Sequence, residues 1–350
     1  MPATRSTRPD RAVVLVTGGT GFLGRHVVAE LRAQSMRTRV LMRSDLNLAL
    51  PCDERAVGEL GDDDAIARAV DGVRAIVHCA GRVAGPGTTA EYFRDNVAGT
   101  ERLLAAAGSA GVERFVHVSS TGIYGLPSGS RAVTEDTSLD SDPPARGAYT
   151  WSKLESDRRV QEFSRATGLS TVTLRIGILV GPGGPEFIAR LCYGRLGGRV
   201  VVIGRRDTEL PLCHVEDAAR AVVLAVVTPG ASGPYNLVAE SVTQEEWLIE
   251  RERQGNAVRV LFFPPRLAEA IAVGLAAAAQ VTGRPAPRLS PHFVRRKTES
   301  MQYDTTRARR ELGWTPRIGF RAPIEARSPV VEVARLFALL FSNLAAALLM

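Results

Sequence analysis

The chain has 350 residues, of which 45% are hydrophobic and 23% charged, an ordinary balance for a globular protein with room for one large α/β domain and a smaller one. Its formal net charge of +7 comes mostly from scattered arginines, without the interleaved aromatic residues of a nucleic-acid reader, so nucleic-acid binding is disfavoured. The four cysteines form no C-x-x-C pair and the histidines no H-E-x-x-H motif, which argues against a disulfide framework or a metal site.

The first predicted unit is a strand, a glycine-rich turn and a helix near the amino terminus. A short apolar run at 12–16 leads into the stretch T-G-G-T-G-F-L-G at 17–24, and helical periodicity follows. Gly18 permits a tight turn, Gly21 lets the backbone approach a phosphate, and Gly24 allows the helix to pack closely on the strand. Free N–H groups and the dipole at the helix N-terminus favour an anion. The turn therefore predicts a binding site for a dinucleotide pyrophosphate.

The second predicted strand, at 38–43, ends in Met42 and Arg43. The end of this strand is expected to lie over the adenosine ribose, where an acidic side chain would select NAD and an arginine would favour a 2′-phosphate. Arg43 therefore favours NADP(H), and NAD(H) stays compatible with the sequence. The alternative interpretation is that Arg43 is a surface residue after a strand.

Strands and helices then alternate along the chain. We predict a strand at 56–60, a helix that begins near Asp62, a strand at 74–81, a helix at 96–110 and a strand at 114–120. This alternation predicts an α/β fold with a doubly wound parallel sheet and helices on both faces. We expect 1–180 to form a dinucleotide-binding Rossmann domain with returning segments near 205–240, and 181–325 to form a smaller α/β substrate lobe.

Tyr149 and Lys153 are the residues that point most directly to a reaction. They stand four positions apart on a predicted helix, so they project from the same face. A nearby cation stabilises the phenolate and would lower the pKa of Tyr149, which could then act as a general acid or base near neutrality. The spacing alone also fits an exposed helical pair. Here, however, it follows the glycine-rich turn and a strand that ends in Ser119 and Ser120.

In this combination the sequence resembles the extended short-chain dehydrogenase/reductases, also called NAD-dependent epimerase/dehydratases. The resemblance spans about 11–320. Its matching pieces are the glycine-rich turn, His78 to Gly81, Asn96 to Thr100, Val118 to Ser120, Tyr124-Gly125, Tyr149 with Lys153, Leu174 to Ile176, Gly181 to Gly183, His214 to Asp217, and the stretch from Asp304 to Pro316. Members of the 3β-hydroxysteroid dehydrogenase and ketoreductase type are the most similar in character.

The resemblance implies a role for each matching residue. Tyr149 would exchange a proton with the substrate oxygen, and Lys153 would bind the nicotinamide ribose and lower the pKa of Tyr149. Ser120 would hydrogen-bond the reacting oxygen, with Ser119 as the second candidate for that role. Hydride would pass between the substrate carbon and the nicotinamide. The residues predicted to bind the cofactor are Thr17, Gly18, Gly19, Thr20, Gly21, Phe22, Leu23, Gly24, Arg43, Glu59, Leu60, Cys79, Ala80, Gly81, Asn96, Ser119, Tyr149, Lys153 and Ile176.

Departures from the family pattern narrow the choice of reaction. Thr121 and Gly122 stand where the 4,6-dehydratases have an acidic pair, so dehydration is disfavoured, and Arg43 argues against an epimerase that holds NAD tightly. The sequence therefore favours an NAD(P)(H)-dependent oxidoreductase that interconverts a ketone and a secondary alcohol on a lipophilic substrate. A nucleotide-sugar epimerase with tightly bound NAD is the main alternative. A cofactor-binding scaffold without turnover is the second.

The sequence beyond residue 180, which is expected to bind the substrate, contains fewer specific motifs. Elements predicted beyond 180 are a helix at 187–196, a strand at 199–203 and a helix at 217–227. His214 is expected to be structural at the junction of the lobes rather than catalytic. Arg205 and Arg206 suit either a substrate diphosphate or a solvated loop. The apolar stretch 267–281 fits either the wall of a lipophilic pocket or a buried helix of the small lobe.

The last segment, 326–350, forms an apolar tail in which Ser342 and Asn343 are the only polar residues from Leu336 to Met350. A span needs about 20 consecutive apolar residues, so we do not predict a transmembrane helix. Docking on the protein, docking on a second subunit of a homodimer, and peripheral contact with a membrane all fit this tail. Residues 1–11 lack the apolar region of a secretory signal, so a cytoplasmic location is expected, with or without membrane association.

Overall fold

The computed structural model describes residues 13–44, 50–83, 87–125, 132–184, 192–255, 259–282 and 289–322. At its centre lies a seven-stranded sheet in the order β11-β6-β5-β4-β1-β2-β3, in which every neighbouring pair is parallel. Its strands are β1 (Val13–Thr17), β2 (Arg37–Met42), β3 (Glu54–Val57), β4 (Val73–His78), β5 (Arg114–Ser120), β6 (Ser170–Ile176) and β11 (Gly233–Leu237). The predicted doubly wound parallel sheet is confirmed.

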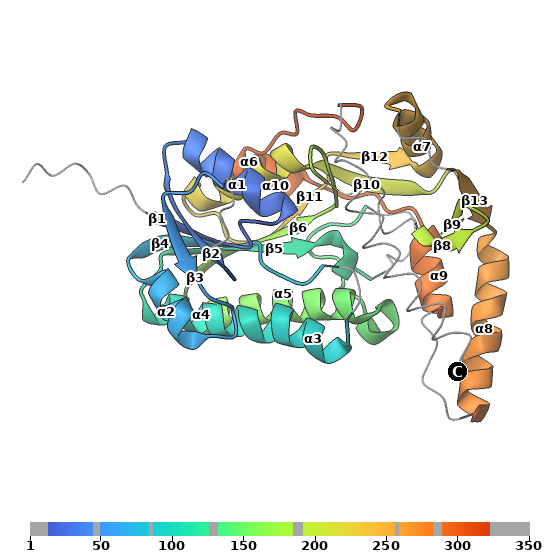
Figure 1. Ribbon diagram of the computed structural model, residues 1–350, viewed down its shortest axis with the longest axis horizontal. Helices are drawn as coiled ribbons and strands as arrows, with labels where there is room; N and C mark the ends of the chain where they lie inside the picture. The colour runs from blue at the N-terminus through green and yellow to red at the C-terminus, as the bar shows by residue number, and fades with distance from the viewer. Residues whose placement is uncertain are drawn as a thin grey trace, which may run out of the picture.

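Helices cover both faces of this sheet (Figure 1). One face carries α1 (Phe22–Ala33), α6 (Val215–Val227) and α10 (Thr306–Leu312), and the other carries α2 (Asp63–Val70), α3 (Thr89–Phe93), α4 (Gly99–Ser109) and α5 (Ala148–Thr167). Valine and leucine side chains of the strands point alternately to the two faces, so each face has its own hydrophobic cluster. This double coverage explains why the strands read as nearly continuous apolar runs.

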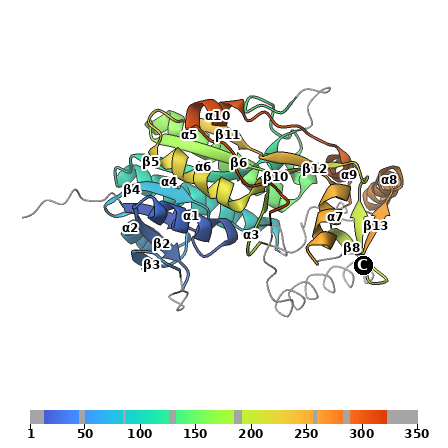
Figure 2. The same ribbon diagram turned by 90° about the horizontal axis from the view of Figure 1, so that it is seen from above.

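Two three-stranded sheets complete the described fold. One has the order β12-β10-β7 and the other the order β13-β9-β8. Their strands are β7 (Ile178–Val180), β8 (Cys192–Leu196), β9 (Arg199–Ile203), β10 (Glu209–His214), β12 (Glu240–Thr243) and β13 (Val260–Phe263). The helices beside them are α7 (Gln244–Arg253), α8 (Pro265–Thr282) and α9 (Pro291–Thr298). Figures 1 and 2 both place α8 at the outer edge of this part of the molecule.

One predicted helix is wrong in the part that the structure describes. We expected a helix at 187–196, but 192–196 form strand β8, which pairs antiparallel with β9. The two strands are joined by Gly197 and Gly198, whose φ angles of 54° and 75° favour glycine. A short apolar stretch cannot by periodicity alone be assigned to a strand or a helix. The rest of the prediction, 187–191, lies outside the described residues.

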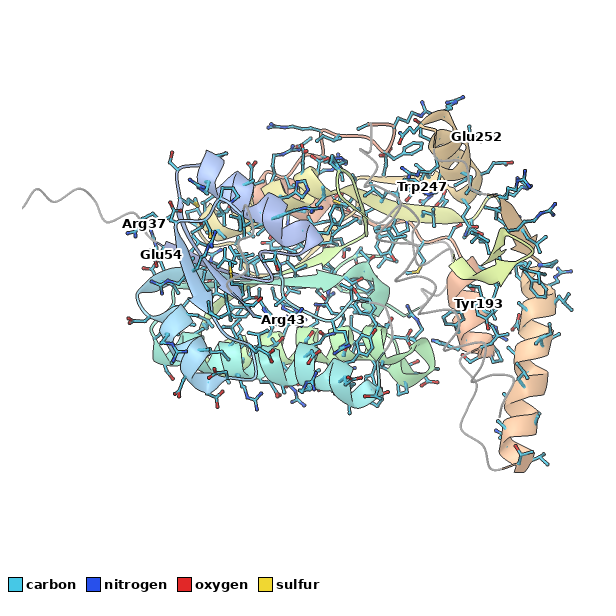
Figure 3. The ribbon with its side chains drawn as sticks, viewed as in Figure 1. Arg37, Arg43, Glu54, Tyr193, Trp247 and Glu252 are labelled. Carbon is cyan, nitrogen blue, oxygen red and sulfur yellow. The ribbon has the colours of Figure 1, made fainter. Side chains whose placement is uncertain are left out.

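The other predicted elements are confirmed with small shifts. The third strand, predicted at 56–60, is Glu54–Val57, so it begins two residues earlier and ends three residues earlier than predicted. At its start the Glu54 carboxylate pairs with Arg37 at 2.7 Å and with Arg39 at 2.6 Å on the neighbouring strand (Figure 3). α2 begins after Asp62, whose side chain accepts a hydrogen bond from the Ala65 backbone N–H at 3.0 Å.

The tail at 326–350 lies outside the described residues. Among the helices that the structure does describe, none combines the length and apolar character needed to cross a bilayer.

Candidate active site

Five neighbouring strands of the central sheet end at one edge, and predicted site residues follow each of them. The glycine-rich turn follows β1, residues 79–81 follow β4, and Arg43 follows β2. Ser120 ends β5 directly opposite Ile176, which ends β6. The strand order reverses between β1 and β4, and ligands of doubly wound sheets bind at such a switch point. The fold therefore gathers the predicted residues along one edge.

The turn after β1 has room for backbone but not for side chains. Gly18 has a φ of 69°, and a Cβ atom on it would lie 2.6 Å from the backbone nitrogen of Ala80. A Cβ atom on Gly24 would lie 2.1 Å from the carbonyl oxygen of Gly18, so Gly24 packs on the turn itself. Gly21 is the N-cap residue of α1, and no side chain in the described part of the chain caps that N-terminus. A tight turn with free helix N–H groups fits a bound pyrophosphate.

The Gly24→Ala variant is expected to lose about 1–3 kcal/mol of unfolding free energy and to bind dinucleotide more weakly. The added methyl group would meet the backbone oxygen of Gly18, which cannot move without opening the turn. Denaturant unfolding and a fluorescence titration with dinucleotide measure the two effects. Gly274→Ala is the control, because a Cβ atom there meets no atom within 4 Å in the middle of α8. A Gly24→Ala variant as stable as this control would contradict the packing argument.

Thr17 and His78 join β1 to β4 beneath the turn. The Thr17 hydroxyl lies 2.7 Å from Nδ1 of His78, and it accepts a hydrogen bond from the Ala80 backbone N–H at 3.3 Å. Nε2 of His78 lies 2.9 Å from the hydroxyl of Thr100. Burial lowers the pKa of His78 to about 3, so the ring is neutral. The Thr17 side chain thus holds residues 79–81 in place and points into the protein.

Asn96 connects the chain after β4 with α5. It lies in a π-helical segment, Arg94–Ala98, a distortion that is frequent at functional sites. Its side-chain oxygen accepts a hydrogen bond from the Arg82 backbone N–H at 2.6 Å, and its nitrogen donates to the Ser152 hydroxyl at 2.9 Å. Asn96 therefore orients the first turns of α5, the helix that carries Tyr149 and Lys153.

Ser120, Tyr149 and Lys153 come together at the end of β5. The Ser120 side chain lies within reach of the Tyr149 phenol and acts on its pKa as a hydrogen-bonding neighbour. The Lys153 ammonium lies one turn further along α5 and donates to the carbonyl oxygen of Val118 at 2.6 Å. The Ser120 hydroxyl also accepts the Gly122 backbone N–H at 3.1 Å, which fixes its position. The structure thus assembles the three residues that the sequence singled out.

The electrostatics of this group differ from the prediction. Burial raises the pKa of Tyr149, and the hydrogen bond with Ser120 only partly opposes that shift. Lys153 was predicted to lower the pKa of Tyr149, but its ammonium is engaged by the carbonyl of Val118. The predicted lowering is therefore wrong for this structure. The Tyr149 phenol is protonated near neutral pH.

Unfolding free energy is expected to rise between pH 8 and pH 10.5 through Lys153. Burial lowers the pKa of this group from 10.5 to about 8, although Asp157 opposes the shift. In that interval the unfolded chain binds a proton that the folded chain has released, so stability increases with pH by up to about 3 kcal/mol. Denaturant unfolding across this range measures the slope, and Lys153→Met is expected to reduce it. Equal slopes in the two proteins would contradict the shift.

Ser119 has a different partner from Ser120. Its hydroxyl donates to Oδ2 of Asp157 at 2.8 Å, and the Asp157 carboxylate accepts two further hydrogen bonds from Arg175 at 3.0 and 3.1 Å. All three side chains are buried. Ser119, the second candidate for contact with the reacting oxygen, is therefore part of a buried ion-pair network.

The same network extends to β11. Arg175 donates to the Tyr124 hydroxyl at 2.9 Å, and that hydroxyl donates to the side-chain oxygen of Asn236 at 2.7 Å. Our sequence reasoning missed Asp157 and Asn236. Asp157 stands four residues after Lys153 and so shares its helix face, which was an available signal. Asn236 gave none.

Other residues that the sequence singled out are not part of the Ser120–Tyr149–Lys153 group. Glu59 is exposed, and Leu60 packs against Gly99 at the start of α4. Arg205 and Arg206 are exposed and pair with the carboxylates of Asp207 at 2.9 Å and Glu245 at 3.1 Å.

His214 begins α6 from the end of β10, where its Nδ1 accepts the Glu216 backbone N–H at 3.3 Å. Its imidazole also lies close to Gly181, at the end of β7. These contacts fit the structural role expected for His214.

Comparison with known proteins agrees with this geometry. The model of the NAD-dependent epimerase/dehydratase family matches residues 14–238, which is more than half of the chain. The chain is 30% identical over 319 residues to 3 beta-hydroxysteroid dehydrogenase/Delta 5→4-isomerase of Mycobacterium tuberculosis, covering 87% of this chain and 86% of that protein. It is 32% identical over 318 residues to sterol demethylase protein B of Methylococcus capsulatus, covering 86% and 93%.

A solved structure shows the same architecture. MoeE5 in complex with UDP-glucuronic acid and NAD superimposes with a TM-score of 0.69 and 26% identity, over 89% of this chain and 96% of that one. The switch-point turn, the parallel seven-stranded sheet and the family match agree with one another. The chain therefore belongs to the NAD-dependent epimerase/dehydratase family, the extended short-chain dehydrogenase/reductases, and is an NAD(P)-dependent oxidoreductase/epimerase of that family.

Proposed function

We propose that this chain is an NADP(H)-preferring oxidoreductase that interconverts a ketone and a secondary alcohol on a lipophilic substrate. The observation that carries the proposal is that Ser120, at the end of β5, lies within reach of the Tyr149 phenol of α5, with Lys153 one turn away. Two hydroxyl groups held at one point can both donate to the same substrate oxygen. That arrangement suits a carbonyl that gains negative charge as it is reduced.

Each residue has a definite task in the reductive direction. Tyr149 would give its phenolic proton to the substrate oxygen, and Ser120 would donate a hydrogen bond to that oxygen. The raised pKa of Tyr149 suits a proton donor. Lys153, charged below its pKa of about 8, would bind the nicotinamide ribose. When bound, the nicotinamide supplies or accepts the hydride.

The residues that would hold the cofactor lie along the edge described above. Gly18, Gly21 and Gly24 with the N-terminus of α1 would take the pyrophosphate, and Arg43 would take a 2′-phosphate. Arg43 is exposed just beyond β2 (Figure 3), and it has no ion-pair partner among the described residues. An exposed guanidinium at this position supports NADP(H) over NAD(H). Further candidates are Cys79, Ala80, Gly81, Asn96 and Ile176.

The Arg43→Gln variant is expected to bind NADP(H) about 10- to 100-fold more weakly, because one charge-assisted hydrogen bond to the 2′-phosphate is lost. Binding of NAD(H), which lacks this phosphate, is expected to stay the same. Fluorescence titrations with the two reduced cofactors give both dissociation constants. The matched control is Arg199→Gln, another exposed arginine, in the β8–β9 sheet. A wild-type preference for NAD(H) would overturn the assignment of Arg43.

The substrate class rests on the relatives. The two relatives described above are named for steroid or sterol reactions, which supports a lipophilic ketone or alcohol here. The alternative, a nucleotide-sugar epimerase, draws support from MoeE5, whose structure contains UDP-glucuronic acid and NAD. Arg205 and Arg206 pair with carboxylates at the surface, which weakens their case as diphosphate ligands.

The proposal is tested by incubating the full chain with NADPH and a set of steroid and long-chain ketones. We expect NADPH to be consumed in equal amount to the secondary alcohol formed, as measured by absorbance and mass spectrometry. Interconversion of UDP-sugars without net consumption of cofactor would overturn the proposal in favour of the epimerase. Binding of dinucleotide without any turnover would favour the scaffold. A homodimer and a cytoplasmic location stay predictions.

A further inference from the structure

Helix α8 presents an apolar surface to solvent. Its inner side is narrow: Ala268 and Ala272 are fully buried against α9 and the end of β9. On its outer side Leu267, Ile271 and Leu275 are 50%, 42% and 45% exposed. Their spacing of four residues places them in one row along the helix. The sequence-based alternative of a buried helix at 267–281 is therefore wrong.

The outer side of α8 also lacks charge. Arg266 and Glu269 lie in its first turns, and no charged residue follows from 270 to 282. The Glu269 carboxylate accepts a hydrogen bond from Arg295 of α9 at 2.6 Å, which neutralises it. Val273 and Val281 are also exposed, on other sides of the helix from this row. A contiguous exposed apolar surface of this kind marks an interaction site.

The segment around this helix is strongly basic. Residues 259–298 contain seven arginine or lysine residues and a single acidic residue, so this segment has a formal charge of +6 in a chain of +7. The basic residues stand before, at the start of and after the apolar part of α8, at positions 259, 266, 284, 288 and 295–297. An apolar helix flanked in the sequence by basic residues is typical of helices that lie on anionic membranes.

We propose that α8 is a membrane-contact helix that lies in the surface of an anionic bilayer. Leu267, Ile271 and Leu275 would enter the boundary between headgroups and acyl chains, and Arg266 would contact lipid phosphates. A second copy of the chain fits this surface less well, because it would bring two segments of +6 together. The apolar tail at 326–350 also fits less well, since its one acidic residue, Glu332, cannot balance the charge.

The test is vesicle co-sedimentation of the full chain. We expect binding to phosphatidylcholine vesicles that contain phosphatidylglycerol to be at least about tenfold tighter than binding to pure phosphatidylcholine, and to weaken at high salt. A triple variant, Leu267→Gln with Ile271→Gln and Leu275→Gln, is expected to bind at least about tenfold more weakly. The matched control is Val57→Gln with Val227→Gln and Ile249→Gln, three valine or isoleucine residues of 44–48% exposure on other elements, which should bind like the wild type.

Thermal unfolding checks that the triple variant is folded. If it is not folded, Arg266→Gln provides a second, independent test. This variant is expected to bind anionic vesicles about fivefold more weakly than the wild type and to bind neutral vesicles equally well. Wild-type binding that is absent, or that both α8 variants retain in full, overturns the proposal. So does a wild-type dimer that the triple variant converts to a monomer without any vesicle binding. A tail variant, Leu339→Gln with Phe341→Gln and Leu344→Gln, that loses binding while the triple variant keeps it would assign the contact to the tail and also overturn the proposal.

Discussion

Replacing Tyr149 by phenylalanine is expected to lower kcat of the ketone–alcohol reaction by about 10²–10⁴-fold, because the substrate oxygen loses its general acid. The phenyl ring keeps its place in α5, and only the hydroxyl that bonds to Ser120 is removed. Dinucleotide binding is therefore expected to persist. Single-turnover kinetics with NADPH and the best ketone substrate measure the chemical step, and a fluorescence titration measures cofactor binding.

The matched control is Tyr303→Phe, which removes a phenolic hydroxyl elsewhere in the fold. The Tyr303 hydroxyl contacts the sulfur of Met301 at 3.8 Å and no residue of α5, so this variant should turn over like the wild type. A Tyr149→Phe variant that retains more than about a tenth of the wild-type kcat would remove Tyr149 from the mechanism. Loss of dinucleotide binding in that variant would mean that the site had collapsed, and Ser120→Ala would then test the same oxygen contact.

Replacing Asp157 by asparagine is expected to lower the unfolding free energy by about 3–5 kcal/mol, since it leaves the guanidinium of Arg175 buried without its counter-charge. Burial alone would lower the pKa of Arg175, but the neighbouring Asp157 carboxylate raises it above its ordinary value. The two side chains are buried, so solvent does not screen them. Denaturant unfolding at neutral pH gives the difference.

Two controls separate the buried charge from a general effect of the substitution. Asp63→Asn breaks an exposed ion pair with Arg102 at 3.5 Å and should change stability by less than about 1 kcal/mol. The double variant Asp157→Asn with Arg175→Met should recover part of the loss, because the orphan charge is gone. A single Asp157→Asn variant as stable as the wild type would show that the network does not hold the fold.

The same variant has a second readout at the site. The Asp157 carboxylate raises the pKa of Lys153 against the effect of burial. Asp157→Asn should therefore move that pKa below about 8, which the pH dependence of stability would report. The network thus acts on Lys153 through charge and on Ser119 through a hydrogen bond.

Local patterns were enough to predict the glycine-rich turn after β1. A tight turn needs a residue that tolerates positive φ, which Gly18 supplies. A helix that begins on that turn needs glycine where its backbone meets the turn, which Gly24 supplies. The positions of these two glycines therefore predict the geometry of the turn. The strand–helix alternation likewise predicts a parallel sheet, because parallel neighbours require crossover helices. Tyr149 and Lys153 share a face because four residues make about one helical turn.

Other features depend on partners that are distant in the chain. The raised pKa of Tyr149 comes from burial, and Lys153 is held by Val118, more than thirty residues earlier. Arg175 and Asn236 meet Asp157 and Tyr124 only after four separate segments have packed together. β8 is a strand because β9 pairs with it, a contact that overrides a weak helical pattern.

The features predictable from sequence therefore differ from those that only the structure shows in the range over which their causes act. Backbone requirements, helix periodicity and the order of motifs act within a few residues, and they already predict the fold, the turn after β1 and the grouping of Ser120, Tyr149 and Lys153. Burial and charge pairing sum over the whole fold, so only the folded chain sets the protonation of Tyr149 and Lys153 and creates the Asp157–Arg175 pair. For the same reason, only the packing of α8 on its alanines shows that its leucines and isoleucine face outward.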